Sequence, residues 1–595
     1  MWQGRHWINT VTNRDQALMN IYAVVVLLSV FVYLLVGGYA GRKVKHLDDY
    51  YVAGRNAPTL LIVGTLVASV VSTNSFMGET GFAYSGYGVV VAMQNPIACL
   101  GYVAGALFFG RFLRRSRALT VAEYFGKRFN SQRVQAVAGV TLILGVGGYL
   151  IAVTLGAALL LSEVFGVSYG ATLFAVWLSY TSFTLTSGSR GVVLTDTIMF
   201  ILFSTVAVAA LGFIVDASGG WFATVSDLAN FAAKPDVISW HGPVGEGARW
   251  ATATDAMTWA VIMGLAWGTV FAVSPWQASR YLIARNEHTV MRSACITFAL
   301  LLMLWIVLYF AGAAINLSNP DIEVNEKAMM WAAMNLMPTI VGALLLAGIA
   351  AAALSSASTF LSLVGFSAVN DVLRHDKSDD EMLRVTRYAM LVIGVITLAL
   401  AYFIPPRILW ITYFIAGVYA SSWGPIGFMS VWSKRVTASA AFWGIIVGFV
   451  SNALLSLLRQ QGIISLPVYL DPIVVGAVLS LVTILVVSRF GSVSAAEQEY
   501  RLALHKTPPE ERDAEKYRQT IRWAKLLMVA GVLVGIAIAS LYSIPYQQAK
   551  SDGGALVFWT GENFFAFAYA ASFMIAGGLA YWGIKRSYQP GASDE

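Results

Sequence analysis

The chain has 595 residues, of which 57% are hydrophobic and only 12% are charged, and its mean hydropathy is +0.67. A soluble protein carries about 25% charged residues, so the composition excludes a soluble enzyme, a secreted disulfide-rich domain and a disordered chain. The net charge of +7 is better explained by the basic loops of a membrane protein than by nucleic-acid binding. The sequence therefore predicts an all-α polytopic membrane protein.

Apolar runs separated by polar breaks predict fifteen membrane-spanning helices, because each span needs roughly 20 apolar residues. The first is too long and too poorly flanked to be a cleaved signal peptide. The predicted spans lie near 20–40, 58–80, 85–110, 134–162, 168–187, 190–215, 255–284, 289–315, 338–367, 387–404, 407–432, 437–457, 470–488, 522–545 and 562–585.

The loops predict an orientation. Segments 41–57 and 111–133 are rich in Lys and Arg, and such loops remain in the cytoplasm. Alternation along the chain then puts the N-terminus outside and the C-terminus in the cytoplasm. The longest polar segments are 217–253, expected outside, and 489–521, expected inside as a polar helix with a proline break.

Few ionisable residues lie within the predicted spans, and each is a functional hypothesis because burying charge in a bilayer is unfavourable. Glu79 and Asp196 lie well inside, whereas Asp255, Arg280, Asp471 and Lys525 lie at span ends, where snorkelling explains them. The sequence has no nucleotide-binding motif, and the predicted spans contain no histidine and no pair of carboxylates. The pattern favours a protein that moves a solute over an enzyme.

Two predicted spans have interiors that favour a break. The span at 58–80 contains four consecutive small polar residues, Ser72 to Ser75, which compete with helical hydrogen bonds. The span at 255–284 contains Gly264, Gly268 and the pair Ser274–Pro275, and proline removes a helical donor. Broken helices at corresponding positions of two halves indicate a secondary transporter. Close packing through small residues is the alternative explanation.

A third feature lies in the span at 338–367. Ala352, Ser355 and Ser356 share one helix face at i, i+3 and i+4. Two hydroxyls facing the free carbonyls of a broken helix would offer neutral oxygen ligands to a small hard cation. Alternatively, the serines bond carbonyls of their own helix.

These features occur together with several motifs and resemble the sodium:solute symporter family over roughly residues 20–435. The family includes sodium-coupled sugar, proline, pantothenate, iodide and monocarboxylate carriers. The motifs are DDYYVAGR at Asp48–Arg55, TVAEYFGKRF at Thr120–Phe129, GVVLTD at Gly191–Asp196, PWQASRYL at Pro275–Leu282, AALSS at Ala352–Ser356 and the pair Gly424–Pro425.

The resemblance implies a leucine-transporter-like fold with a five-plus-five inverted repeat, one preceding helix and about four following helices. The divisions are then 1–50 for the extra helix and its cytoplasmic loop, 51–216 for the first repeat, 217–253 for an extracytoplasmic loop, 254–435 for the second repeat, and 436–595 for the C-terminal helices with the cytoplasmic loop 489–521.

The resemblance also implies binding residues. A sodium ion would be held by the carbonyls of Ala68, Val71 and Ala352 and the hydroxyls of Ser355 and Ser356. Asp196 would attract or relay the ion on its cytoplasmic side, unless it only pairs with Arg190 one turn away. The expected solute cavity is lined by Ser72, Thr73, Asn74, Ser75, Gln94, Trp267, Thr269, Phe271 and Tyr413.

The expected function is sodium-driven import of a small organic solute across the cell membrane, with a carboxylate, amino acid or vitamin-like compound as the solute. A sugar is disfavoured because Asn74 and Ser75 stand where sugar carriers have an acidic and an amide residue. The alternatives are a solute sensor that signals to a partner protein, an ion channel, and a proton-coupled symporter that uses Glu79. The specific solute and the oligomeric state do not follow from the sequence.

Overall fold

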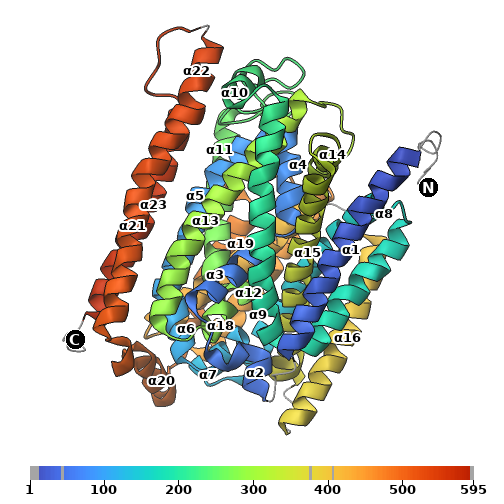
Figure 1. The fold of residues 1–595 in the computed structure, drawn as a ribbon. Coiled ribbons are helices and arrows are strands. Elements are labelled where there is room, and N and C mark those ends of the chain that lie inside the picture. Colours follow the sequence, from blue (N-terminus) through green and yellow to red (C-terminus); the bar gives the residue numbers. More distant parts are fainter. Residues whose placement is uncertain (1–12, 42–45, 374–377, 405–407, 552, 590–595) are drawn as a thin grey trace.

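The computed structural model describes residues 13–41, 46–373, 378–404, 408–551 and 553–589, and over these residues the chain is a bundle of helices without a β-strand (Figure 1). Residues 42–45, which contribute Arg42, Lys43 and Lys45 to the first predicted basic loop, lie outside the described residues. The bundle confirms the predicted all-α class.

The first part of the chain supplies the helices on both sides of the first break. Their bounds are α1 (Asn13–Gly41), α2 (Leu47–Val52), η1 (Ala53–Arg55), α3 (Thr59–Ala68), η2 (Asn74–Glu79), α4 (Thr80–Phe82), η3 (Ala83–Tyr87), α5 (Gly88–Gly105), η4 (Ala106–Gly110), α6 (Arg111–Arg115), α7 (Val121–Arg128), α8 (Gln132–Phe165), α9 (Tyr169–Ala217) and α10 (Trp221–Ala229).

The second part begins after the loop that contains α10. Its helices are α11 (Ala253–Val273), α12 (Pro275–Ile283), α13 (Glu287–Ala314), η5 (Ile315–Leu317), η6 (Asn325–Lys327), α14 (Ala328–Asn335), α15 (Thr339–Ser367), η7 (Ala368–Leu373), α16 (Asp379–Phe403), α17 (Ile408–Trp432), α18 (Ala438–Gln460), η8 (Val468–Leu470), α19 (Pro472–Val487), η9 (Ser488–Phe490), α20 (Ala495–His505), η10 (Pro509–Glu511), α21 (Ala514–Ile538), η11 (Ala539–Ser543), α22 (Ile544–Lys550) and α23 (Gly561–Tyr588).

Twelve helical segments of the described chain are long and apolar enough to cross a membrane. Three of the fifteen predicted spans, at 58–80, 168–187 and 407–432, are not among them. The first is interrupted, the second is the first part of α9, and the third is helix α17. A count of fifteen crossings therefore stays a prediction, although each predicted span coincides with helical structure.

Both predicted helix breaks are present. Helix α3 ends at Ala68, and helical structure resumes only after residues 69–72, with the wide turns of η2. Helix α11 ends at Val273, Ser274 has extended backbone angles, and Pro275 is the first residue of α12. The second break falls at the predicted proline. The first lies at 69–72, just before most of the predicted polar run, of which only Ser72 is in the break and Thr73 to Ser75 are already helical.

The two broken helices meet at one end of the bundle. The Ala57 amide donates to the Ile283 carbonyl at 3.0 Å, and the Arg285 amide donates to the Ala57 carbonyl at 3.0 Å. The short helix α7 follows the first broken helix and α5, and the short helix α14 follows the second broken helix and α13. These two short helices lie at opposite ends of the molecule (Figure 1). This opposite placement is what an inverted repeat requires.

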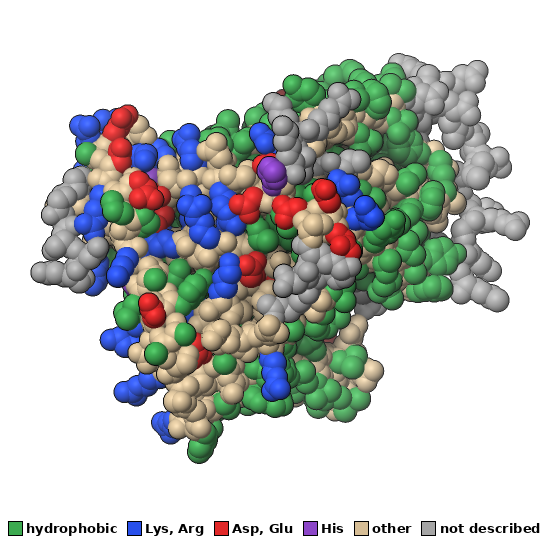
Figure 2. Space-filling model, turned by 90° about the horizontal axis from the view of Figure 1, so that it is seen from below, with side chains coloured by type: hydrophobic (Ala, Val, Ile, Leu, Met, Phe, Trp, Pro, Cys, Tyr) green, Lys and Arg blue, Asp and Glu red, His purple; other side chains and the backbone are tan. Residues whose placement is uncertain are grey.

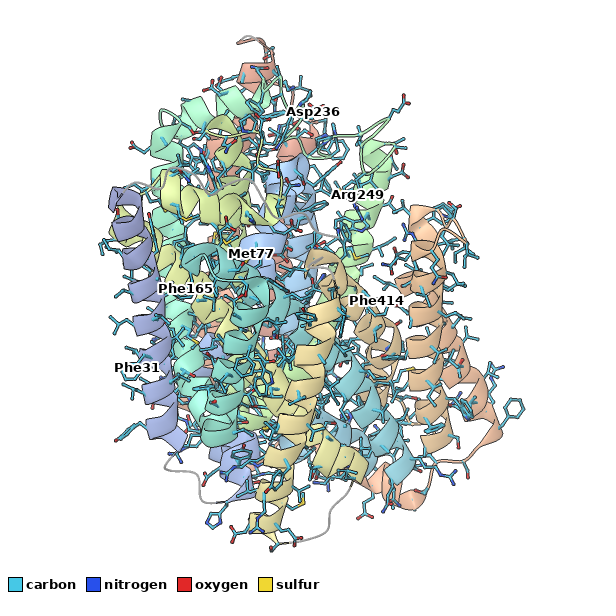
Figure 3. The ribbon with its side chains drawn as sticks, turned by 90° about the vertical axis from the view of Figure 1, so that its right-hand side faces the viewer. Phe31, Met77, Phe165, Asp236, Arg249 and Phe414 are labelled. Carbon is cyan, nitrogen blue, oxygen red and sulfur yellow. The ribbon has the colours of Figure 1, made fainter. Side chains whose placement is uncertain are left out.

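Helix α15 is at the centre of the fold, where it packs against α8 and α9, and nearly all of its side chains are buried. Helices on the outside expose apolar side chains, as expected of surfaces that face lipid. Phe31 of α1, for example, is 55% exposed and projects from the edge of the bundle (Figure 3). Helices α21 and α23 pack together as a hairpin at the opposite edge (Figure 1).

Candidate functional site

The first break brings its free backbone carbonyl to the serine pair of α15. The hydroxyls of Ser355 and Ser356 each lie 3.2 Å from the Ala68 carbonyl oxygen, and all three residues are almost completely buried. In a continuous helix this carbonyl would accept the amide of Ser72. Because α3 ends here, the carbonyl faces the two serine hydroxyls instead.

The other two predicted cation ligands are near in the chain. Val71 lies within the break, and Ala352 lies one turn before Ser356 on α15. Both are fully buried. The group as a whole offers neutral oxygens, the donor type that suits a small hard cation. Among the described residues, no group of three or more His, Cys, Asp or Glu side chains offers an alternative metal site.

Asp196 joins this group to two further helices. Its carboxylate accepts hydrogen bonds from Thr65 of α3 at 2.5 Å and from Ser355 at 2.6 Å. Arg280 of α12 lies 3.8 Å from the same carboxylate and donates to Thr359 at 2.7 Å. Four helices, α3, α9, α12 and α15, therefore meet at one buried carboxylate.

Two sequence-based interpretations are wrong here. Arg190 does not pair with Asp196 but lies 3.7 Å from Asp49. Arg280 does not snorkel to water, because it is only 5% exposed and directs its guanidinium to Asp196. The reason is that α12 is buried along nearly its whole length, so a side chain in its last turn faces protein and not water.

A small enclosed cavity lies beside the break, between η2, α5, α8, α11 and α13. Val70, which lines it, lies in the non-helical segment 69–72 and two residues after Ala68. Four of the predicted solute-binding residues line it, namely Asn74, Gln94, Trp267 and Phe271. The other lining residues are Val70, Glu79, Asn95, Ala98, Tyr149 and Trp305.

Polar side chains around the cavity form a chain of hydrogen bonds centred on Glu79. Asn74 donates to one carboxylate oxygen at 3.0 Å, and Tyr309 donates to the other at 3.0 Å. Thr412 in turn donates to Asn74 at 3.0 Å, and Asn95 donates to Tyr309 at 3.1 Å. The arrangement holds a buried carboxylate at the wall of the cavity.

The cavity also offers an unused donor. The indole N–H of Trp267 is buried and has no hydrogen-bond partner among the described residues. Buried polar groups are nearly always hydrogen-bonded, so this donor is available to a ligand. A bound molecule would thus meet an acceptor at Glu79 and a donor at Trp267.

The remaining predicted cavity residues lie near the cavity but do not line it. Tyr413 bonds Gln94 at 3.3 Å, and Ser75 accepts from Trp305 at 3.4 Å. Ser72 caps the Asn74 amide at 3.1 Å, and Thr73 packs against Gly156 of α8. Thr269 is turned away, bonding the Leu265 carbonyl and packing on Gly424 of α17.

Sequence reasoning missed Glu79 and Asn95 as cavity residues. The sequence presents Glu79 only as a group that could carry a proton, and no local pattern places it at a cavity wall. Two consecutive amides, Gln94 and Asn95, are unusual within an apolar span. That pattern marks Asn95 together with Gln94.

A cluster of aromatic rings lies next to the cavity, beyond Gln94 and Tyr413. Trp259 lies 5.4 Å from Tyr413 and 5.0 Å from Trp250, measured between ring centroids. Arg249, from the loop that contains α10, stacks on Trp410 at 3.5 Å. Figure 3 shows Arg249 between Met77 of η2 and the end of the molecule that carries Asp236. Burial lowers the pKa of Arg249 to about 10, so it remains charged at neutral pH.

Comparison with known proteins gives relatives along most of the chain. The sodium/pantothenate symporter of Escherichia coli (strain K12) is 26% identical over 468 residues, covering 76% of this chain and 93% of that protein. The sodium/proline symporter of Salmonella typhimurium is 24% identical, covering 82% and 97%. The sodium/sialic acid symporter of Aliivibrio fischeri is 24% identical, covering 71% and 86%.

Solved structures show the same fold. A Na⁺-coupled sialic acid symporter in a substrate-bound outward-open state matches with a TM-score of 0.66 at 21% identity, covering 80% of this chain and 98% of that one. Mhp1, a nucleobase-cation-symport-1 transporter, matches with a TM-score of 0.51 at 12% identity, covering 76% and 98%. The leucine-transporter-like fold is thereby confirmed.

The model of the sodium:solute symporter family matches residues 50–448, about two thirds of the chain. The two broken helices, the serine pair and the cavity all fall within this range. The chain therefore belongs to the sodium:solute symporter family.

Proposed function

We propose that the sodium ion binds where Ala68 meets Ser355 and Ser356, with the Val71 and Ala352 carbonyls completing its oxygen ligands. The single observation that carries this proposal is the pair of 3.2 Å contacts from the two hydroxyls to the Ala68 carbonyl. They join the break in α3 to an unbroken helix of the second half. An ion held there stabilises the arrangement in which α3 and α15 are in contact. Coupling requires an ion that binds one conformation of the transporter more tightly than the others, and this contact provides that difference.

The solute is bound at the neighbouring cavity, in contact with Asn74, Gln94, Trp267 and Phe271, in an arrangement in which the cavity is wider than the roughly 10 Å³ of this closed state. Glu79 accepts from a donor group of the solute, and Trp267 donates to an acceptor group. A solute that carries both a carboxylate and an N–H or O–H group fits these two partners. Pantothenate, proline and sialic acid, which the names of the relatives mention, all have this combination.

Because Val70 lines the cavity while Ala68, the last residue of α3, contacts the serine pair, the end of α3 and the non-helical segment that follows it take part in both sites. Binding of the ion orders this segment, and the solute then meets an ordered wall. The reverse holds equally, since the coupling free energy between two sites is reciprocal. The transport cycle is alternating access, with the aromatic cluster around Trp259 as the outer closure.

The chain lies in the cell membrane with its N-terminus outside and its C-terminus in the cytoplasm. Residues 51–216 and 254–435 form the two inverted repeats, preceded by 1–50, separated by the outer loop 217–253 and followed by 436–595. The opposite positions of α7 and α14 and the two broken helices support this division. One positive charge that crosses 100 mV releases about 2.3 kcal/mol, which supports roughly 40-fold accumulation.

The experiment is sodium-driven uptake in proteoliposomes with a panel of labelled pantothenate, proline, sialic acid, short monocarboxylates and sugars. Ser355→Ala with Ser356→Ala should raise the sodium concentration for half-maximal uptake of the transported solute. Ser362→Ala, on the same helix and bonded only to Ser358, is the matched control. Unchanged sodium dependence in the double variant would remove the serine pair from the ion site.

The same assay separates the rival functions. A solute sensor would bind a member of the panel without net uptake. A proton-coupled carrier would accumulate solute under a pH gradient without sodium. Either result would overturn the sodium-coupled proposal.

A further inference from the structure

A large pocket lies at the end of the bundle that carries α7, outside the transport site. It is enclosed by α6, the last turn of α17, helix α20 of the 489–513 segment and the last turns of α23. Its volume is about 1200 Å³. Lys and Arg side chains are concentrated on this end of the molecule, on the side where α20, α21 and α23 lie (Figure 2). We refer to it as the basic pocket.

The charge of the basic pocket is strongly positive. Its lining contains five basic side chains and one acidic one, which are Arg111, Arg115, Lys506, Arg512, Arg586 and Glu499. Arg115 is neutralised by Glu287, whose carboxylate accepts from it at 2.6 and 2.8 Å. Arg111 bonds the Ser587 hydroxyl, yet its buried Nε has no partner among the described residues. A cavity with this excess of basic side chains fits an anion.

One wall of the basic pocket is apolar and aromatic. Phe108 and Phe428 line it, together with Trp432 and Trp582. The two tryptophans are 46% and 49% exposed, although the indole N–H of Trp432 is satisfied by the Phe108 carbonyl at 2.9 Å. Exposed tryptophans at the ends of spans are typical of the depth of lipid headgroups. Arg586 stacks over Trp582 at 5.6 Å, which brings positive charge to the same depth.

The helix that closes the pocket is docked and not a loose connector. Helix α20 begins with a capping box, in which Ser494 and Glu497 bond each other's backbone amides. Its buried face includes Leu504, whose carbonyl accepts from Arg115 at 2.7 Å. His505 packs on Phe112 and Trp432 at 4.8 and 5.3 Å. A ligand in the pocket would therefore contact three elements that are distant in sequence.

We infer that the basic pocket binds the phosphate headgroup of an anionic phospholipid, with an acyl chain along the wall formed by Phe108, Phe428 and Trp432. Basic pockets between helices at the membrane surface suit such headgroups. A free phosphate or phosphate monoester would use the same basic residues but would leave the apolar wall without a partner. The lipid would join α20 to α6 and α23 and hold the C-terminal hairpin against the transporter core.

The test compares ligands on the full-length protein purified in a neutral detergent. Native mass spectrometry counts bound phosphatidylglycerol, phosphatidylcholine and glycerol 3-phosphate. The inference expects saturable binding of phosphatidylglycerol and a rise in the unfolding temperature that neither of the other two produces. Equal binding of glycerol 3-phosphate would reassign the pocket to a soluble phosphate compound and overturn the lipid assignment.

Matched variants locate the site. Arg111→Gln with Arg586→Gln removes two basic groups of the pocket, whereas Lys434→Gln with Arg435→Gln removes two exposed ones on a loop outside it. Each removed contact should weaken phosphatidylglycerol binding about five-fold, and the pocket pair about 25-fold. Lys506→Gln provides a single-site version should the pocket pair fail to fold. Equal weakening by the control pair would show surface attraction only and overturn the inference.

Discussion

The Ser355 hydroxyl lies 2.6 Å from the Asp196 carboxylate and 3.2 Å from the Ala68 carbonyl. A serine has one proton to donate and two lone pairs with which to accept. The shorter, charge-assisted bond to Asp196 takes the proton. The lone pairs of Ser355 are then available on the side of Ala68, where the proposed cation binds. In the proposed ion site, Asp196 therefore acts by orienting Ser355 and not as a ligand.

Asp196→Asn should therefore weaken sodium binding while preserving the shape of the site. The loss of a hydrogen bond to a charged group is worth about 1.5–3 kcal/mol, so the sodium concentration for half-maximal uptake should rise roughly 10- to 100-fold. The measurement is uptake against sodium concentration at a saturating concentration of the transported solute.

The same change leaves Arg280 buried without its carboxylate, which costs about 3–5 kcal/mol of stability when a buried pair is broken. Asp196→Asn with Arg280→Gln removes both charges and serves as the control. It should recover the unfolding temperature but not the sodium affinity. Recovery of both would mean that Asp196 acts only by neutralising Arg280.

The helix breaks were predictable because their causes are local. Four small polar residues before Phe76 and the proline at 275 act on their own helix, whatever surrounds it. The partner of Asp196 was not predictable in this way, because Arg280 comes from another helix and reaches the carboxylate only after the second break redirects it. The snorkelling interpretation considers only the helix that carries Arg280, so it does not include the carboxylate on α9.

The cavity lining was predicted in part for a similar reason. Trp267 and Phe271 stand four residues apart on one face of α11, whereas Thr269 lies between them on the opposite face. Around Asn74 the wide turns of η2 shift the side chains from their α-helical directions. The sequence alone does not reveal that widening, so the four polar residues 72–75 could not be assigned to cavity or packing individually.

Glu79→Gln should reduce solute affinity and leave sodium affinity unchanged. The amide keeps the shape and accepts from Tyr309, but it loses the charge that holds a donor group of the solute. The KM of the transported solute should rise by about 10-fold or more. Uptake kinetics at saturating sodium measure this change, and Glu163→Gln, whose side chain pairs with Lys327 outside the cavity, is the control. An unchanged KM would exclude Glu79 from solute binding.

Gly188→Ala should destabilise the fold. Gly188 has φ 56° and ψ −169°, a conformation accessible essentially only to glycine, and a Cβ there would lie 2.4 Å from the Tyr50 ring. The backbone strain alone is worth about 1–3 kcal/mol. The apparent unfolding temperature of the purified variant should fall, whereas Gly212→Ala, on the same helix with open space around it, should leave it unchanged or raise it. Equal behaviour of the two variants would contradict the strain argument.

Glu511 should make the docking of the 489–513 segment depend on pH. Its carboxyl is 5% exposed, one oxygen accepts from the Glu287 amide at 3.1 Å, and the other is buried without a partner among the described residues. Burial, assisted by the charge of Glu287, raises the pKa of Glu511 above its ordinary value. A raised pKa in the folded state means that the protonated form is favoured there, so this contribution to stability is complete at low pH and is lost as the pH rises through the folded pKa.

Glu511→Gln removes the titrating group but keeps an acceptor for the Glu287 amide. At pH 8 the variant should be more stable than the original protein by about 1 kcal/mol, and at pH 4 the difference should disappear, because Glu511 is then protonated. Unfolding temperatures at the two pH values and hydrogen exchange of the α20 amides measure the effect. Glu510→Gln, next in the chain and exposed to solvent, should show no such pH-dependent gain. A constant difference between pH 4 and pH 8 would mean that packing, and not charge, distinguishes glutamine from glutamate at this position.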